Sequence, residues 1–322
     1  MGHASGAPSG NAPVSDSTDR TTVGLRVDVD TRRGLDEGVP RLLELFRRLG
    51  IRASFFVTMG PDHSGRAIRR ALRPSFLAKM WRTNPFKLYG IRTLLSGTLV
   101  PARLVGAGAP AMLRQIADEG HEIAPHGWDH VGWQDRIHRL DQPAIRADLD
   151  LAARSFAAAV GVAPSASAAP GWRTSPVALA VQDGRGLLYA SDTRGETPFR
   201  PSISDGMLET IQLPTTMPTM DEVMGRIADV PAALAQAVRP GINIFTLHAE
   251  VEGGAHLKIF EAFLAELVKS RARLARLDDV AASVIASGEA LPVARVVRGW
   301  IGGRSDWIAL QEMARAQGGR AS

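Results

Sequence analysis

Val23-Gly-Leu-Arg-Val-Asp-Val-Asp30 is the stretch that decides the fold of this chain. Residues 23–29 form a short apolar run with β-branched side chains, which predicts a buried strand. Because side chains alternate along a strand, Asp28 and Asp30 share one face while the valine between them points to the other. A single aspartate could simply begin a turn. Two on one face of a buried strand end need a paired charge or a metal ion to offset their burial, so this end is a candidate site.

Strand patterns alternate with helical patterns along the rest of the chain. Further strands are predicted at 51–59, 121–124, 165–169, 187–190, 209–213, 242–248 and 273–277. Helices are predicted at 39–49, 110–118, 142–160, 221–236 and 257–270. This alternation indicates an α/β fold with a parallel sheet. Because no phosphate-binding glycine fingerprint marks a doubly wound sheet, we expect the sheet to close into a (β/α) barrel.

Histidines follow two of the later strands. His126-Gly-Trp-Asp-His130 comes directly after the strand at 121–124, and on a helical turn its two imidazoles share a face. His248 ends the strand at 242–248. The spacing of the pair also arises by chance, and a lone histidine after an apolar strand is usually structural. Catalytic groups of a barrel lie at the carboxyl ends of its strands, however, and all these polar residues fall there. Their common position indicates one site.

These residue types together favour metal-assisted hydrolysis. One aspartate and two histidines would make an open divalent-metal site in which a bound water is activated. A second carboxylate could accept the proton of that water, and a histidine on the opposite side could protonate a leaving amine. Such a set suits the cleavage of an amide, whose poor leaving group needs a proton donor. Zinc, cobalt, manganese and nickel all accept these ligands, so the sequence does not choose between them.

The composition of the 322 residues limits the other classes of protein. A hydrophobic content of 45% is enough for a large α/β core, and the absence of cysteine excludes disulfides and thiolate metal sites. Residues 1–21 are rich in Gly, Ser, Ala and Pro, which predicts a flexible tail and not a signal peptide. Because the chain has no apolar run of about 18 residues, we expect no membrane span and a cytoplasmic protein.

The basic character of the chain is concentrated in one segment. Residues 63–117 contain no Asp or Glu, and the rest of the chain is net acidic although the whole has a net charge of +5. Aromatic and leucine side chains lie between the basic ones, which favours an interfacial helix on an anionic membrane surface. The candidate membrane-binding residues are Arg69, Arg70, Arg73, Trp81 and Arg82. A solvated basic face is an equal alternative, whereas nucleic-acid binding lacks any accompanying recognition motif.

Five motifs, taken in chain order, resemble those of polysaccharide deacetylases of the NodB-homology type. They are Val-Asp28-Val-Asp30, His126-x-x-x-His130, Ala-Pro170-Gly-Trp172-Arg173, Ser191-Asp192-x-Arg194-Gly195 and Leu247-His248-Ala. Longer segments, including QLPTTMPTMDEVMGR and FTLHAEVEGG, are similar to the branch that deformylates 4-deoxy-4-formamido-L-arabinose on undecaprenyl phosphate. The resemblance runs from about Val23 to about Gln311.

The resemblance implies a role for each matching residue. Asp28 would be the general base and His248 the general acid, and the ligands of one divalent metal would be Asp30, His126 and His130. Arg173 would orient the base, with Asp192 as a further acidic residue behind the site. The candidate substrate-binding residues are Trp172, Arg194 and Glu250. Because Asp-Val-Asp replaces the adjacent Asp-Asp of the generic pattern, the roles of the two carboxylates could be exchanged.

The resemblance also implies a domain organisation and a biological role. A distorted (β/α) barrel would span 22–285, with a basic, membrane-facing insertion at 63–117 and a C-terminal extension at 286–322 that packs on the barrel or the membrane. The implied reaction is deformylation of a formamido sugar on undecaprenyl phosphate, for lipid A modification and resistance to cationic peptides. The implied partners are that lipid and the anionic inner-membrane surface, with no nucleic acid.

Two alternatives to this function stay open at the level of sequence. One is an N-deacetylase of peptidoglycan or another aminosugar polymer, against which the expected absence of an export signal counts. The other is a non-catalytic lipid- or nucleic-acid-binding barrel. That second alternative requires the acid, base and ligand residues to have been lost, and all of them are present.

Overall fold

The computed structural model describes residues 21–66, 96, 101–204, 206–304 and 306–312 of the chain. Its strands are β1 (Thr22–Val29), β2 (Ser54–Val57), β3 (Glu122–Pro125), β4 (Ala166–Ser167), β5 (Tyr189–Ala190), β6 (Arg200–Ile203), β7 (Gly206–Met207), β8 (Ile211–Gln212), β9 (Ile242–His248), β10 (Arg273–Ala275), β11 (Val293–Gly299) and β12 (Ile308–Gln311). Its α-helices are α1 (Val39–Leu49), α4 (Pro110–Asp118), α5 (His130–Arg136), α6 (Gln142–Val160), α7 (Pro176–Asp183), α8 (Met220–Val223), α9 (Val230–Gln236), α10 (Leu257–Lys269) and α11 (Leu277–Ala286). Short irregular helices are η1 (Gly34–Gly38), η3 (Pro170–Trp172) and η4 (Val251–Ala255).

The central sheet is parallel and is built around β1. Strand β9 pairs with β1 along its length, while β10 pairs with the start of β1 and β2 with its end, and β3 continues the sheet beyond β2. All eight residues of β1 are buried, which its run of apolar residues predicts. The register places Asp28 opposite His248 on one side and Phe56 on the other. The carboxyl ends of these strands are therefore level with one another.

A second parallel sheet, β4-β5-β8, continues the curve of the first. Isolated hydrogen bonds connect the two on each side. Ala168 N donates to Pro125 O beside β3, and Thr216 N and Met217 N both donate to Ile244 O in β9. Within the residues that the structure describes, no regular ladder joins the two sheets on either side. The expected α/β fold with a parallel sheet is confirmed, in the form of a ring of strands whose hydrogen bonding is interrupted.

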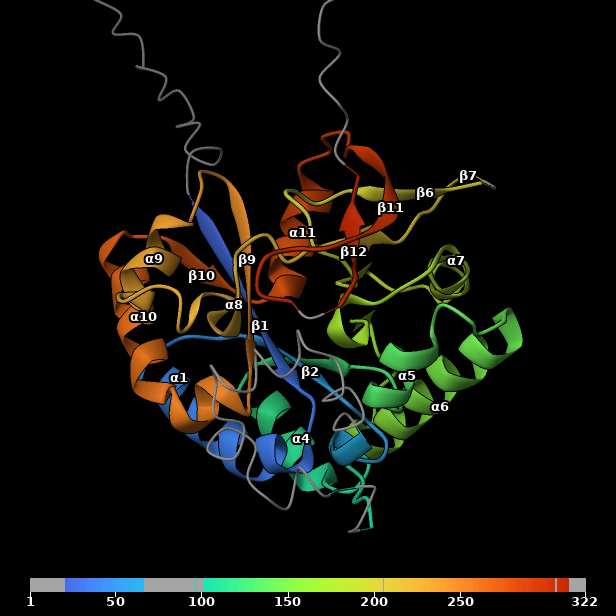
Figure 1. Ribbon diagram of the computed structural model, residues 1–322, viewed down its shortest axis with the longest axis horizontal. Coiled ribbons are helices and arrows are strands. Elements are labelled where there is room, and N and C mark those ends of the chain that lie inside the picture. The colour runs from blue at the N-terminus through green and yellow to red at the C-terminus, as the bar shows by residue number, and fades with distance from the viewer. Residues whose placement is uncertain (1–20, 67–95, 97–100, 205, 305, 313–322) are drawn as a thin grey trace, which may run out of the picture.

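Helices surround the central strands, with α1, α9 and α10 on one side of Figure 1 and α5, α6 and α7 on the other. Helix α1 shows why they form. It starts beside Pro40, buries Leu42, Leu43 and Phe46 in the main core cluster, and ends at Gly50 in the left-handed conformation. Helix α4 begins inside the basic segment 63–117 and ends at Asp118, and it packs into the same core through buried leucine and isoleucine side chains.

The single helix expected at 221–236 is wrong. The structure has two short helices there, α8 and α9, separated by a stretch in which Gly225 adopts a positive φ of 70°. Helix α9 then restarts with Asp229 as its N-cap, whose side chain accepts a hydrogen bond from Ala232 N. The residues on both sides favour helix, but the glycine and the new N-cap divide the segment into two helices.

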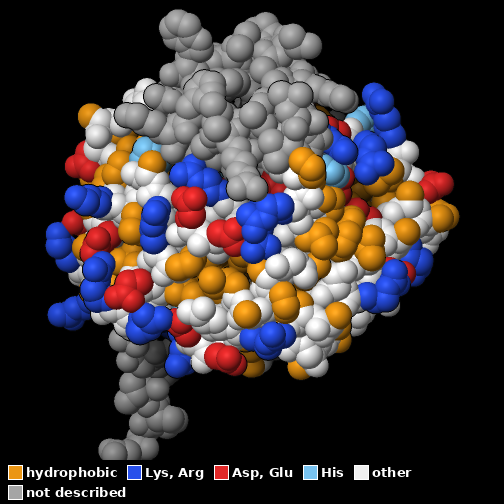
Figure 2. Space-filling view, turned by 90° about the horizontal axis from the view of Figure 1, so that it is seen from below, with side chains coloured by type: hydrophobic (Ala, Val, Ile, Leu, Met, Phe, Trp, Pro, Cys, Tyr) orange, Lys and Arg blue, Asp and Glu red, His pale blue; other side chains and the backbone are white. Residues whose placement is uncertain are grey.

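A third sheet, β12-β11-β6-β7, lies outside the ring and holds the C-terminal part of the described chain. The sequence analysis does not predict its strands. Strand β11 pairs in parallel with β6 and antiparallel with β12, so residues 293–311 form a hairpin that is attached to the rest of the protein by β6. Among the described residues, no helix is long and apolar enough to span a bilayer. Seen from below, the described surface carries interspersed acidic and basic side chains (Figure 2).

Candidate active site and metal centre

The carboxyl ends of β1, β3 and β9 bring the predicted site residues together. Asp28 lies at the end of β1 and Asp30 directly after it, His126 and His130 follow β3, and His248 ends β9. Within the sheet, Ala249 N donates to Asp28 O at 2.9 Å, which ties the chain after His248 to the end of β1. Five side chains from three distant segments thus share one end of the sheet, where parallel strands present functional groups.

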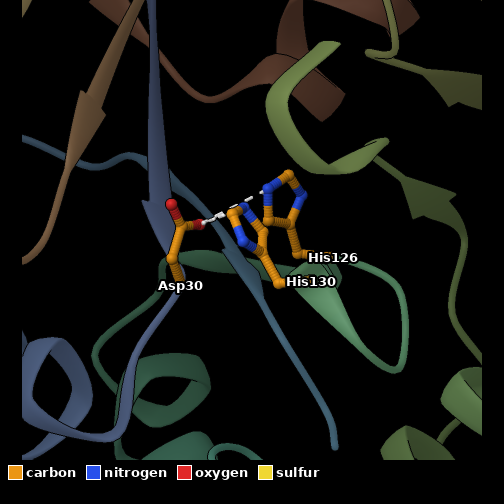
Figure 3. A group of neighbouring side chains, drawn as sticks. All are labelled: Asp30, His126 and His130. Atoms are coloured by element: carbon orange, nitrogen blue, oxygen red, sulfur yellow. Dashed lines mark ion pairs between the residues drawn. The ribbon is translucent and has the colours of Figure 1, made fainter. Parts of the chain in front are cut away.

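Asp30, His126 and His130 form the cluster expected for a metal ion. Figure 3 shows Asp30 pointing from the end of β1 toward both imidazoles. Its Oδ1 atom lies 3.5 Å from His126 Nε2 and 3.3 Å from His130 Nε2, and the three ligand atoms all lie within 4.8 Å of one another. Asp30 Oδ1 and His126 Nε2 are buried and have no hydrogen-bond partner. Buried polar atoms without partners are costly, and a divalent cation among them would satisfy both.

The hydrogen bond on the far side of His126 favours the same interpretation. His126 Nδ1 lies 2.9 Å from Ala168 O, and a carbonyl only accepts, so the proton is on Nδ1. The lone pair of Nε2 is then directed at the carboxylate of Asp30. Burial lowers the pKa of His126 to about 4, although Asp28 opposes this, so the ring is neutral at pH 7. A neutral imidazole with a free Nε2 is the form that binds a metal ion.

Asp30 is under electrostatic strain that a cation would relieve. Burial raises the pKa of Asp30 well above its ordinary value, and the neighbouring carboxylates of Glu250 and Asp28 raise it further. The side chain of Glu250 binds the backbone here: its Oε1 accepts from the backbone N–H of Asp30 and Thr31 and from the Thr31 hydroxyl. Glu250 therefore shapes the turn that presents Asp30.

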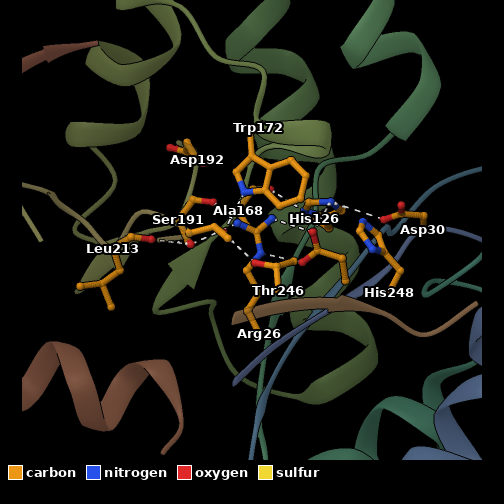
Figure 4. Close-up of polar contacts among 12 residues, drawn as sticks. Arg26, Asp30, His126, Ala168, Trp172, Ser191, Asp192, Leu213, Thr246 and His248 are labelled. Atoms are coloured by element: carbon orange, nitrogen blue, oxygen red, sulfur yellow. Dashed lines mark hydrogen bonds and ion pairs between the residues drawn. The ribbon is translucent and has the colours of Figure 1, made fainter. Parts of the chain in front are cut away.

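Unlike the carboxylate of Asp30, the carboxylate of Asp28 is bound by an arginine, which is not among the residues predicted from the sequence. Arg26 lies two residues earlier in β1, is fully buried, and donates to both carboxylate oxygens of Asp28, at 2.7 and 2.8 Å. Burial raises the pKa of Asp28, but Arg26 and His126 outweigh it, and the net shift is downward. The signal in the sequence is an arginine on the same face as Asp28 within an otherwise apolar strand. Its guanidinium also contacts Ser191, as Figure 4 shows.

Arg173 does not take the role that the resemblance assigns to it. Its guanidinium pairs with Asp306 at 2.8 Å and donates to Gln134 O at 2.7 Å, while the guanidinium on Asp28 is that of Arg26. The physical reason is the backbone at Gly171 and Trp172. Both have positive φ angles, of 61° and 52°, so the motif turns and Arg173 faces the C-terminal hairpin.

Asp192 is buried behind the site. Its Oδ2 accepts from Gln212 Nε2 at 3.0 Å, its backbone N–H donates to Gln212 Oε1, and burial raises its pKa. The preceding residue, Ser191, accepts from Arg26 through its hydroxyl oxygen. Asp192 therefore supports Asp28 indirectly: it follows Ser191, which contacts Arg26, and Arg26 binds Asp28.

His248 is held from two sides. Its backbone N–H donates to Glu252 Oε2 at 2.7 Å, and its ring packs edge-to-face on Trp172, with centroids 6.1 Å apart and planes at 84°. Glu252 is fully buried, and burial raises its pKa to about 8. Glu252 is not among the residues predicted from the sequence; its signal there is its position four residues after His248, from which its side chain reaches back to the strand end.

The candidate substrate-binding residues lie inside the protein. Trp172 is 1% exposed, and Arg194 pairs with Glu222 at 2.7 Å and donates to Met217 O. Glu250 is used in the turn after β1. All three hold the site together, and in this structure they offer a substrate almost no surface. The candidate membrane-binding residues lie outside the described part of the chain: Arg69, Arg70, Arg73, Trp81 and Arg82.

Comparisons with known proteins agree with the fold and show the family. The family model for polysaccharide deacetylases matches residues 15–189. A relative from Shewanella sediminis, named probable 4-deoxy-4-formamido-L-arabinose-phosphoundecaprenol deformylase ArnD, is 41% identical over 251 residues, covering 76% of this chain and 81% of its own. A relative of the same name from Wigglesworthia glossinidia brevipalpis is 34% identical, covering 87% of this chain and 98% of its own.

Solved structures share the fold at low sequence identity. A putative polysaccharide deacetylase from Mycobacterium smegmatis has a TM-score of 0.61 at 20% identity, covering 91% of this chain and 99% of its own. Puue allantoinase has a TM-score of 0.58 at 17% identity, covering 87% and 95%. From the family model and the two curated relatives we conclude that this chain belongs to the polysaccharide deacetylase family and is a hydrolase acting on an amide C–N bond.

Proposed function

We propose that this enzyme deformylates 4-deoxy-4-formamido-L-arabinose-phosphoundecaprenol with the help of one divalent metal ion. The names of both curated relatives support the substrate. The observation that supports this mechanism is the difference between the surroundings of two aspartates. Asp30 presents an oxygen without a hydrogen-bond partner to two imidazoles, whereas Asp28 is saturated by Arg26 and remains ionised. The first environment suits a metal ligand and the second a base.

Asp30, His126 and His130 are the residues that would hold the metal. When bound, the ion supplies Lewis acidity, which makes water more acidic and polarises the formyl oxygen. The orientation of these ligands is fixed by the protein. Ala168 O holds the ring of His126, and Asp129 caps helix α5 by accepting from Gly132 N at 2.9 Å, which fixes the first turn that carries His130.

Asp28 accepts the proton of the attacking water. Because the pKa of Asp28 is lowered, the carboxylate is ionised at neutral pH, and Arg26 keeps both oxygens in a fixed plane. The water oxygen adds to the formyl carbon, the C–N bond breaks, and the electron pair of that bond goes to the sugar nitrogen. His248, from the neighbouring strand, gives this nitrogen a proton. The products are formate and the free 4-amino sugar on its lipid.

The lipid-linked substrate supports a location at the cytoplasmic face of the inner membrane. The acid-free segment 63–117 would provide the attraction to anionic lipids, roughly 1 kcal/mol for each basic residue near the surface. In this organisation the barrel spans 22–285, with a tail at 1–21 and an extension at 286–322.

Reversing the charge of Arg69, Arg70 and Arg73 should release the protein from anionic liposomes. Unchanged binding would exclude this contact. The product's role in lipid A modification and resistance to cationic peptides follows from the same substrate.

The decisive experiment is detection of formate loss by mass spectrometry. Purified enzyme is incubated with formamido-arabinosyl phosphoprenol, with Asp28→Asn and His248→Ala as controls. We expect a mass loss of one formyl group in the wild type, abolished by a chelator and restored by added metal. Hydrolysis of an N-acetylated aminosugar polymer but not of the formamido lipid would favour the alternative N-deacetylase. Binding of the lipid without any hydrolysis would favour a non-catalytic barrel.

A further inference from the structure

Trp172 adopts an unusual backbone conformation next to the proposed general acid. Its φ angle of 52° lies in the left-handed region, and in the described chain only Arg271 shares this among residues other than glycine. Large side chains rarely adopt this conformation, and it persists only where the surroundings enforce it. Because the ring is 1% exposed, no contact with a substrate explains it in this structure. The contacts of the ring itself must account for the conformation.

The indole ring is attached to the strand that carries His248. Its edge-to-face contact with the His248 ring has a centroid separation of 6.1 Å. Its Nε1 donates to Thr215 Oγ1 at 2.9 Å, and that hydroxyl shares a hydrogen bond of 2.6 Å with Thr246, two residues before His248 in β9. Figure 4 shows the indole of Trp172 above Arg26 and Thr246. A movement of the indole would therefore disturb both the ring and the strand of the acid.

Arg304 contacts the same indole from the C-terminal hairpin. Its guanidinium carbon lies 4.4 Å from the ring, closer than those of Arg194 at 5.2 Å and Arg26 at 5.4 Å. Arg304 is itself held by Glu222, at 2.7 Å, and by Thr219, at 3.1 Å. The family model ends at residue 189, so Arg304 and the hairpin lie outside the region that it matches. The hairpin nevertheless reaches the indole behind the acid.

We propose that Trp172 is a positioning residue for His248 and that Arg304, from the C-terminal hairpin, keeps Trp172 in place. The imidazole of His248 has to point at the leaving nitrogen, and free rotation about its side-chain bonds would spread it over several directions. The edge-to-face contact restricts that rotation, and the arginine above the indole restricts the indole. This inference rests on the proposed function, because it assigns a purpose to the orientation of the proton donor.

The hairpin supplies a matched control in Trp307. This residue also packs against guanidinium groups, those of Arg173 at 5.0 Å and Arg298 at 4.7 Å. It too packs edge-to-face on a histidine, His138, with centroids 6.4 Å apart and planes at 88°. Trp307 thus repeats the chemistry of Trp172 on a histidine that has no part in the proposed reaction.

The first test compares kcat and KM for Trp172→Leu and Trp307→Leu. We expect kcat of Trp172→Leu to fall about 10- to 100-fold, the loss typical of a misplaced catalytic group, with KM little changed. Trp307→Leu should stay within about 3-fold of the wild type, as expected for a group remote from the reacting atoms. Arg304→Gln should lower kcat about 10-fold, and Arg304→Lys, which keeps a cation above the ring, should restore most of it. Equal losses in both tryptophan variants, or none in Arg304→Gln, would overturn the proposal.

A second measurement separates this inference from the proposed function. The protein is labelled with carbon-13 at histidine Cε1, and the His248 resonance is assigned by its loss in His248→Gln. We expect Trp172→Leu and Arg304→Gln to shift or broaden this resonance in the absence of substrate, and Trp307→Leu to leave it unchanged. If the wild type fails to hydrolyse the formamide but these changes occur, the proposed function fails and the positioning role stands. An unchanged His248 resonance in both variants would overturn the positioning role, whatever the activity. If Trp172→Leu does not fold, the same measurements are made on Trp172→Phe and on the Arg304 variants.

Discussion

Two groups of buried carboxylates lie at opposite ends of the central sheet, and they are satisfied to different degrees. At the amino end, Glu122 at the start of β3 accepts from Ser54 Oγ, from the hydroxyl of Tyr189 and from Asp278 N. At the carboxyl end, Asp30 Oδ1 and His126 Nε2 are buried and accept no hydrogen bond. Both ends carry charge in the interior, but only one has its hydrogen bonds complete.

The difference separates a structural group from a functional one. A buried carboxylate that accepts several donors fastens the strands that supply them, as Glu122 does for β2, β5 and the start of α11. A buried oxygen left without a donor lowers stability. For Asp30, the proposed function gives a reason to retain it, the binding of a cation. Substitutions at the two ends should therefore affect different properties of the protein.

Removing a metal ligand should have the largest effect. We expect Asp30→Asn to abolish detectable hydrolysis and to weaken metal binding, by about 100-fold or more in a competition titration of the apoprotein. The same substitution should leave the metal-free protein at least as stable in urea, because it removes the repulsion between Asp30 and Glu250. A clear loss of stability in Asp30→Asn would contradict the comparison of the two ends.

Asp28→Asn should lower activity without removing the metal. Since a positioned base contributes about 10²- to 10⁴-fold, we expect kcat to fall within that range. Metal affinity should stay close to that of the wild type, because both carboxylate oxygens of Asp28 already accept from Arg26. If Asp28→Asn loses the metal and Asp30→Asn keeps it, the roles of the two aspartates are exchanged.

Arg26→Met should destabilise the protein by about 3–5 kcal/mol, because it leaves the buried charge of Asp28 without a partner. Combining it with Asp28→Asn removes that charge, so the double variant should regain much of the lost stability. The check is a double-mutant cycle of urea unfolding free energies. Additive losses would show that the Arg26–Asp28 pair does not act as a unit.

Glu122 should affect stability and its pH dependence while leaving kcat nearly unchanged. Burial, followed by the nearby charge of Asp278, raises the pKa of Glu122 from 4.5 to about 7. A raised carboxyl pKa favours the folded state when the group is protonated, so this contribution is complete below pH 4.5 and is lost as the pH rises through 7. The unfolding free energy of the wild type minus that of Glu122→Gln should therefore fall between pH 5 and pH 8. A constant difference would mean that Glu122 does not titrate in this range.

The elements predicted best from the sequence are those whose signals are local. Helices 39–49 and 142–160 and strand 242–248 have the expected bounds, because apolar periodicity and a left-handed glycine after each of the two helices mark them. The strands of the outer sheet are short and pair with distant segments, so nothing in their own residues predicts them.

The prediction of the site has the same limit, because contacts between distant segments are not encoded in local residues. The strand ends that carry Asp28, Asp30 and the three histidines could be predicted to meet, because parallel strands align their carboxyl ends. Which arginine reaches Asp28 could not, since it depends on the turn at Gly171 and Trp172 that carries Arg173 away. Arg26 lies on the same face of its strand as Asp28, but its pairing with Asp28 depends on how the protein packs.

The pairing of Asp28 with His248 across β1 and β9 has a consequence for how this family can diversify. In the proposed function, the spacing between proton acceptor and proton donor is set by two adjacent strands of the core and not by the loops. Loops around the mouth can therefore lengthen, shorten or change composition, and so admit a different sugar or acyl group, while the geometry of proton transfer is inherited unchanged. Substrate range and chemical competence can evolve separately on this scaffold.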